Sequence, residues 1–343
     1  MQRRFLALLV GLIGLVAAQR HAFAQAAGFA ANRFEPSERG SDWFVGDSLD
    51  LRGAPTLAAG VVFDWAYRPL VLYDPADTGG KALGNVVTDQ VLVHSGASLV
   101  FYDRFRIAVS LPVVLYQHGD DVSAFAHAVR SPDGSSLGDL RLSSDVRVLG
   151  HYGSAFTGAL GFALHFPTGS RDSFTSDETL RFTPRLLIAG DGAGFAYAAK
   201  LAFAYRPFDG VYEGRELGSE AVFSAAGGVR VNDIFVFGPE LFGSTVVTNG
   251  TAFQQRATPL ELLLGLHLTF AKDWMVGTGI GPGFTRGDGT PSMRVTASIE
   301  WAPDVCVDPD GDSICDPVDA CPDVAGLESA DGCPEGRGQK RAP

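Results

Sequence analysis

The stretch "MRVTASIEW", residues 293–301, alternates strictly between apolar and polar side chains. Successive side chains of a β-strand point to opposite faces of the sheet. One face of an extended strand would therefore carry Met293, Val295, Ala297, Ile299 and Trp301. The other face would carry Arg294, Thr296, Ser298 and Glu300. The alternation predicts a strand with one apolar and one polar side.

The same pattern recurs along most of the chain, for example in "PLELLLGLHLTF" (259–270) and "FAYAAKLAFAYR" (195–206). Each such segment has about ten to fourteen residues, the length that a tilted strand needs to cross a bilayer. Twelve segments fit, at roughly 57–68, 89–102, 105–117, 137–149, 155–166, 179–189, 195–206, 219–231, 234–246, 258–270, 274–286 and 292–302. The chain is therefore predicted to be an all-β protein.

The connections between these segments alternate in length. Short turns such as "DR" (103–104) and "AKD" (271–273) follow every second segment, and longer polar connections such as "PTGSRDSFTSDE" (167–178) lie between them. Outer-membrane barrels have short turns on the periplasmic side and long loops on the outer side. We therefore expect a transmembrane, antiparallel, up-and-down β-barrel of about 12 strands over residues 57–302.

A soluble alternative, a secreted β-sandwich or a lipocalin-like barrel, would turn the apolar face inward. Two features favour the membrane. Alternate residues of "MVGTGIGPGF" are glycines on the non-lipid side, a composition unlike a soluble surface. In addition, the apolar faces end near the turns in aromatic residues, as interfacial girdles do, at Trp65, Tyr67, Phe101, Phe105, Phe166, Phe270, Trp274 and Trp301.

The polar faces would line the lumen of this barrel. The charges would pair and close it, or they would line a narrow pore, and twelve strands fit both alternatives. His94, His165 and His267 would serve there as polar filling. The expected charged lining is Asp64, Arg68, Arg106, Asp139, Arg141, Asp145, Arg147, Arg181, Arg185, Lys200, Arg206, Glu220, Arg230, Glu240, Glu261, Arg294 and Glu300.

The N-terminus, residues 1–24, has the pattern of a secretory signal peptide. Two arginines precede a fourteen-residue apolar run, and a small-x-small triplet predicts cleavage before Gln25. Fourteen apolar residues are too few for a transmembrane helix. Residues 25–56 then precede the first strand. They could form a further strand through "SDWFVGDSLDL", a periplasmic strap or an inserted plug, and the sequence leaves these alternatives open.

The tail, residues 303–343, differs in character from the rest of the chain. It carries −7 of the formal net charge of −12 and all the cysteines, Cys306, Cys315, Cys321 and Cys333. Export to an oxidising compartment predicts two disulfides, with three pairings possible.

Within the tail, "DPDGDSICDPVD" (308–319) places acids at positions one, three, five, nine and twelve of a twelve-residue loop. Oxygen ligands at this spacing suit Ca²⁺. The expected ligands are Asp308, Asp310, Asp312, the main-chain carbonyl of Ile314, Asp316 and Asp319. The loop departs from an EF-hand at Ser313, where Gly is usual, and in the shorter Asp at its last position.

Residues 306–333 fit another pattern, DxDxD…DxxDxCPD, which resembles a thrombospondin type 3 repeat. That resemblance implies calcium bound by the aspartates and stapling by disulfides. A barrel followed by such a repeat is similar to OmpA-like outer-membrane proteins, and "LGDLRLSSDVRVLG" and "ALGFALHFPTGS" resemble transporter-like barrels. The sequence ends at "EGRGQKRAP", before the peptidoglycan-binding domain of that family. Either the chain is truncated or the tail serves another end, and a peptidoglycan role is not carried over.

These features predict an outer-membrane β-barrel protein, either structural or a narrow pore, with a Ca²⁺-binding tail in the periplasm. Its expected partners are outer-membrane lipid and cell-envelope components or a surface partner, with no nucleic acid. The alternative is a calcium-dependent adhesion or binding module displayed by the barrel. An enzyme is not expected, because the chain has neither a GxSxG elbow nor an HExxH motif.

Overall fold

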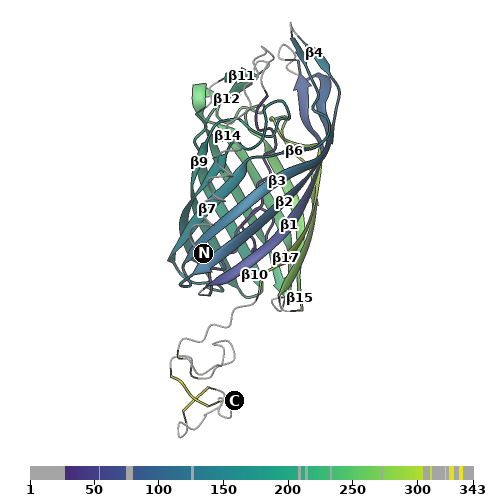
Figure 1. Cartoon of the computed structure of the whole chain (residues 1–343). Helices are drawn as coiled ribbons and strands as arrows, with labels where there is room; N and C mark the ends of the chain where they lie inside the picture. The colour runs from purple at the N-terminus through teal and green to yellow at the C-terminus, as the bar shows by residue number, and fades with distance from the viewer. Residues whose placement is uncertain are drawn as a thin grey trace, which may run out of the picture.

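The structure is a computed structural model that describes residues 28–53, 55–74, 80–124, 127–207, 210–212, 215–231, 234–271, 273–303, 310, 321, 324–327 and 332–334. Within these residues, twelve long strands form one barrel (Figure 1). They are β1 (Thr56–Tyr73), β2 (Ala82–Phe101), β3 (Phe105–His118), β7 (Leu140–Leu149), β8 (Thr157–Phe166), β9 (Arg181–Gly192), β10 (Phe195–Ala204), β13 (Glu220–Val231), β14 (Phe235–Val246), β15 (Leu260–Phe270), β16 (Trp274–Gly281) and β17 (Met293–Trp301).

The barrel closes between its last strand and its first. Each long strand pairs antiparallel with the next, and β17 returns to β1 with Trp301 opposite Ala59 and Met293 opposite Tyr67. Closure pairs the backbone N–H and C=O groups within the wall, which a bilayer requires because its core offers no water. It also removes the sheet edges. The predicted all-β barrel of twelve strands is confirmed.

The two ends of the barrel differ as the loop lengths predicted. The short-turn end carries the turns around residues 102–104 and 193–194 and the connection from Phe270 to Trp274. The long-loop end, at the top of Figure 1, carries short strands that the sequence did not predict. These are the hairpin β4 (Val122–Ala124) with β5 (His127–Val129), β6 (Ser136–Leu137) on β3, the hairpin β11 (Gly210–Tyr212) with β12 (Arg215–Leu217), and a 3-10 helix η2 (Thr248–Gly250).

Several predicted boundaries were wrong. β1 and β2 run well beyond the predicted ends at 68 and 89, because a bulge after Tyr67, with Arg68 at φ 56°, lets the pairing resume at Leu70. β16 stops at Gly281 rather than 286, where Pro282 has no N–H to donate. The stretch "SDWFVGDSLDL" forms no strand.

The side chains of the wall are inverted relative to a soluble barrel. Leu201, Leu264 and Ile299 point outward and are exposed, whereas the charged side chains of Asp64 and Arg294 point inward and are buried. The soluble alternative is therefore wrong, because it would place the apolar face inside. Outward aromatic residues gather at the strand ends as predicted, including Phe105 and Phe270 at the short-turn end. No helix in the described part of the chain is long and apolar enough to cross a membrane.

Candidate functional site

The lumen is occupied by residues 28–53, here called the plug segment. It has no helix or strand, most of its residues are buried, and none is exposed. It begins at the long-loop end, where the Ala31 N–H donates to the Phe174 carbonyl. It ends at the short-turn end, where the Gly53 N–H donates to Asp103. The segment therefore runs the length of the barrel before β1 begins.

Apolar packing holds the plug segment at the long-loop end. The Phe29 ring meets the rings of Phe174 and Tyr212, with centroids 6.1 and 5.1 Å away. Around them lie Ala31 of the plug segment and buried residues of β1 and β2 beyond the bulge and of the short strands β4, β5 and β12, namely Leu70, Leu72, Val86, Val87, Val122, Val129 and Leu217. This cluster anchors the start of the plug segment at the long-loop end.

At the short-turn end, Trp43 and Leu49 are buried in a second apolar cluster that includes Ala159 and Leu187 on the wall. Nearby, the Tyr152 ring lies 4.5 Å from the Arg52 guanidinium, a cation–π arrangement. The plug segment is thus packed at both ends, and its charged middle lies between.

One side of the wall is predominantly basic. This basic arc comprises β3, β7, β8, β9 and β10, and its inward charges are Arg106, Arg141, Arg147, Arg181, Arg185 and Lys200, with Asp145 and Asp191 as the opposing acids.

The plug segment turns acids toward the basic arc. Asp47 lies 2.6 Å from Arg106, and Glu38 lies 3.2 Å from Arg141 and 3.0 Å from Arg185. Each of these pairs is buried, so its attraction is screened far less than on a surface. Glu35 adds a contact with the imidazole of His165 on β8 at 3.1 Å.

The opposite side of the wall is predominantly acidic. This acidic arc comprises β13 to β17 with β1, and its inward acids are Glu220, Glu240, Glu261, Glu300 and Asp64, with Arg230 and Arg294 among them.

The plug segment turns donors toward the acidic arc. Arg33 lies 3.0 Å from Glu220, and Arg39 lies 2.9 Å from Glu300. The Asn32 amide donates to Asp64 at 3.0 Å. The plug segment is therefore charge-complementary to both arcs, although Asp42 reverses the rule by pairing with Arg230 at 2.7 Å.

Glu240 holds the backbone of the plug segment rather than a side chain. Its carboxyl oxygens accept the N–H groups of Phe44 at 2.9 Å, Val45 at 2.8 Å and Gly46 at 3.2 Å. Glu300 likewise accepts the Gly40 N–H at 2.9 Å. Buried N–H groups need such acceptors, because a backbone donor without one is costly.

Several inward charges also pair within the wall. Arg294 bonds Asp64 and Glu261, Arg106 bonds Asp145, and Arg185 bonds Asp145 as well. Arg68 and Arg147 are only half-buried. Of the two alternatives for the lumen, the paired arrangement is the one observed, with the plug segment supplying many of the partners.

Glycines of the wall make room for the Phe44 ring. A Cβ at Gly279 would lie 3.0 Å from Phe44 and 2.7 Å from the Thr296 hydroxyl, so no larger side chain fits without displacing the ring. Phe44 also packs against His267, with ring centroids 4.4 Å apart, and Phe34 packs against His94 at 5.6 Å. The glycine-rich inner face accommodates the plug segment.

Between the middle of the plug segment and the barrel wall, the cavities are small. A cavity of about 70 Å³ lies between it and β2, β3, β7 and β8, and one of about 40 Å³ lies toward β10, β13 and β14. Each exceeds the roughly 10–15 Å³ of accessible volume that one water needs. A further cavity of about 250 Å³ lies at the long-loop end, lined by Gly28 of the plug segment together with Val129, Arg171 and Phe174.

The loop residue Asp177 secures the start of the plug segment. Burial alone would raise the pKa of its carboxyl group, but the guanidiniums of Arg206 and Arg181 and the Ala30 N–H hold that pKa well below its usual value. The ionised carboxylate accepts the Ala30 N–H at 2.9 Å and a bond from Arg206 at 2.6 Å.

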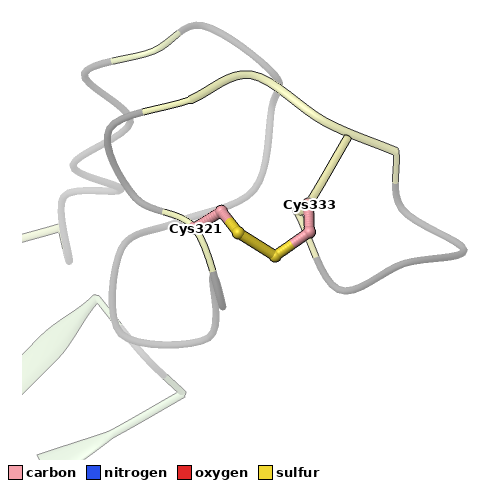
Figure 2. Close-up of a disulfide and its surroundings, with 2 residues drawn as sticks. All are labelled: Cys321 and Cys333. Carbon is pink, nitrogen blue, oxygen red and sulfur yellow. A yellow bond between two sulfur atoms is a disulfide. The ribbon is translucent and has the colours of Figure 1, made fainter. Parts of the chain in front are cut away.

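The tail is described only in part. Of the predicted calcium ligands, Asp310 is described, and Asp308, Asp312, Ile314, Asp316 and Asp319 lie outside the described residues. Cys321 and Cys333 form a disulfide, with Cα atoms 5.1 Å apart (Figure 2). Cys306 and Cys315 also lie outside the described residues. Among the residues that are described, no three His, Cys, Asp or Glu side chains group to hold a metal ion.

Sequence reasoning placed the wall charges correctly but missed the residues of the plug segment that meet them. The signal was present in its composition, since residues 28–53 mix five acids with three arginines directly ahead of a strand. Which of these charges faces which arc depends on the path of the segment, and that path has no periodicity.

No family model matches the sequence. The structure is similar to an outer-membrane channel from Pseudomonas putida F1, with 13% identity, a TM-score of 0.52, and 74% of this chain and 97% of that chain covered. It is also similar to the NanC porin, with 8% identity, a TM-score of 0.44 and 72% of this chain covered. The similarity to the Pseudomonas putida channel shows that this chain and that channel share a fold.

In sequence, 64 residues are 39% identical to outer membrane porin F of Pseudomonas aeruginosa, which is 18% of this chain and 17% of that protein. The match therefore spans about a sixth of porin F.

Proposed function

We propose that the protein is a gated channel of the bacterial outer membrane, closed in this structure by its own plug segment. One observation carries the proposal. The plug segment contributes no strand to the barrel wall and is held mainly by side chains, with backbone bonds at its two ends to Phe174 and Asp103. It can therefore leave the lumen without breaking the backbone ladder that closes the barrel. Its displacement would open a passage lined by the two charged arcs.

The orientation follows from the loops. Outer-membrane barrels keep their short turns in the periplasm. The short-turn end, where β17 ends at Trp301, would then face the periplasm, and the tail that follows would lie there. The plug segment would begin on the outer side and run inward.

The test uses the full-length protein in planar bilayers. A plug-weakened variant, E38A/R39A/D47A, removes the partners of Arg185, Arg106 and Glu300 and leaves the wall intact. Losing one member of a buried pair typically costs about 3–5 kcal/mol. We expect stable conductance from this variant and a mostly closed wild type.

The matched control is S37A, because Ser37 bonds only within the plug segment, to the Trp43 carbonyl. It should behave as wild type. Heat-modifiable migration on a gel would establish that each variant is folded. A folded plug-weakened variant that never conducts would make the protein a structural anchor rather than a channel.

We also propose that residues 308–319 bind Ca²⁺ in the periplasm. The supporting observations are the acids at ligand spacing and the disulfide Cys321–Cys333 directly after them. Calorimetric titration of the full-length protein with CaCl₂ should show binding that D312N/D316N abolishes. The control E335Q removes a tail acid outside the loop and should bind normally. Equal binding by both variants would place calcium elsewhere.

The adhesion alternative has one feature in its favour. Phe253, in the long connection 247–259 at the long-loop end, is 81% exposed. A calcium-dependent surface partner would use such a side chain. Agglutination of cells displaying the protein should then require calcium and be lost in F253S, whereas agglutination unaffected by either change would count against it.

A further inference from the structure

Many of the hydrogen bonds that hold the plug segment involve its backbone. On the acidic arc, Glu240 accepts three consecutive N–H groups and Glu300 accepts one. On other strands, Ser98 donates to the Arg39 carbonyl at 2.8 Å, and Arg141 donates to the Pro36 carbonyl at 2.8 Å. Contacts of this kind depend on a peptide backbone and not on a particular side chain.

The side-chain contacts add a charge pattern. Acids of the bound segment face the basic arc through Arg106, Arg141 and Arg185, and its arginines face Glu220 and Glu300 on the acidic arc. An occupant that carried one sign of charge would leave one arc unpaired, and a buried unpaired charge is costly. The lumen therefore suits an occupant with both signs.

We infer that the lumen is a peptide-binding site, whose ligands are extended peptides of mixed charge that take the place of the plug segment. The inference rests on the proposed function, because the plug segment must leave before a ligand enters. A sugar or a simple ion lacks the row of N–H groups that Glu240 and Glu300 accept. The stretch from Gly40 to Gly46 satisfies both acids, so a peptide of about seven residues is the shortest that reaches both.

The probe is a fluorescein-labelled peptide, RFEPSERGSDWFVGD, with the sequence of residues 33–47. Its partner is the full-length, plug-weakened variant in detergent, which keeps every wall residue. Binding is read by fluorescence anisotropy. We expect saturable binding to this variant, and binding at least tenfold weaker to wild type, whose own plug segment competes.

A charge-exchanged peptide is the matched control. It carries R33E, E35K, E38K, R39E and D47K, which keeps its length and backbone and reverses every side-chain charge except that of Asp42, the acid that pairs with Arg230. We expect it to bind at least tenfold more weakly. Adding E240Q to the plug-weakened variant should weaken the binding of the native peptide about tenfold. Equal binding of both peptides, or no binding to the folded variant, would overturn the inference.

The two proposals fail separately, because anisotropy in detergent requires no conduction. If the plug-weakened variant conducts but binds the native and the charge-exchanged peptides equally, the channel proposal stands and the peptide-binding site is overturned. A variant that binds the peptide selectively but never conducts would keep the site and overturn the channel.

Discussion

Replacing Glu240 by Gln tests how the plug segment is retained. The side chain keeps its size, so the wall should be undisturbed. Glu240 offers two acceptor oxygens, and they take the N–H groups of Phe44, Val45 and Gly46. A Gln offers one acceptor oxygen and an NH₂ group that only donates. At least one N–H of the plug segment would then face a donor in a fully buried place.

The magnitude follows from this count. A buried donor without an acceptor costs about 1–3 kcal/mol, and bonds to a charged acceptor are worth up to twice those to a neutral one. The plugged state should therefore lose about 2–4 kcal/mol relative to the displaced state, in which the same N–H groups bind water. At about 1.4 kcal/mol per factor of ten, the displaced population should rise about 30- to 1,000-fold.

Single-channel recording in planar bilayers measures that population as open probability. E261Q is the matched control, because Glu261 accepts its bonds from Arg294 of the wall. This variant should change the open probability by less than about threefold, or 0.6 kcal/mol. The reasoning is refuted if folded E240Q opens no more often than wild type. An equal rise of the open probability in E261Q would show that the loss of any lumen charge opens the channel. The bonds to the N–H groups of residues 44–46 would then have no specific role.

Four further outcomes are expected. Substituting Gly279 by Val should expel the Phe44 ring and raise conductance, whereas a conductance at the wild-type level would show that the wall yields instead. The lowered pKa of Asp177 means that its contribution is present above about pH 4 and is lost as the pH falls below that toward the folded pKa. The protection of the Ala30 N–H from hydrogen exchange, expressed as the ratio of wild type to D177N, should thus stay constant from pH 8 to 5 and fall only in stronger acid. A fall of this ratio near pH 6 would contradict the prediction. Leu264 points outward at mid-strand, so L264R should destabilise the barrel in vesicles by about 2–4 kcal/mol in urea unfolding, and no change would argue against a lipid contact. Dithiothreitol should break the tail disulfide yet leave heat-modifiable migration intact, since every cysteine lies after the barrel; its loss would tie the barrel to the tail.

The predictability of the fold varies with the kind of interaction. Period-two alternation is local, so "MRVTASIEW" and its counterparts identified each long strand and its inward face. Strand ends were less accurate, because the extension of β1 depends on a bulge at Arg68 and on pairing with β2. The short strands at the long-loop end, two or three residues each, are too short to leave a periodic signal.

The candidate site was half predictable for the same reason. Arg106 and Glu300 could be assigned to the lumen from their positions in alternating strands. Their partners Asp47 and Arg39 could not, because the plug segment has no regular structure and its contacts join residues 59 and 261 positions apart. The calcium loop remains a prediction from spacing alone.

The sequence by itself predicted a barrel whose strands each have an apolar and a polar face, since alternation along a strand assigns its side chains to two faces. The glycine-rich polar face and the aromatic residues near the turns then favoured an apolar outer face. Only the tertiary structure decided that the interior is filled, and by what. Charges of both signs on the inner faces are equally compatible with an open pore and a closed one. The outcome depends on whether a nearby segment can satisfy them, and the plug segment does so by bringing its acids to the basic arc and its donors to the acidic arc.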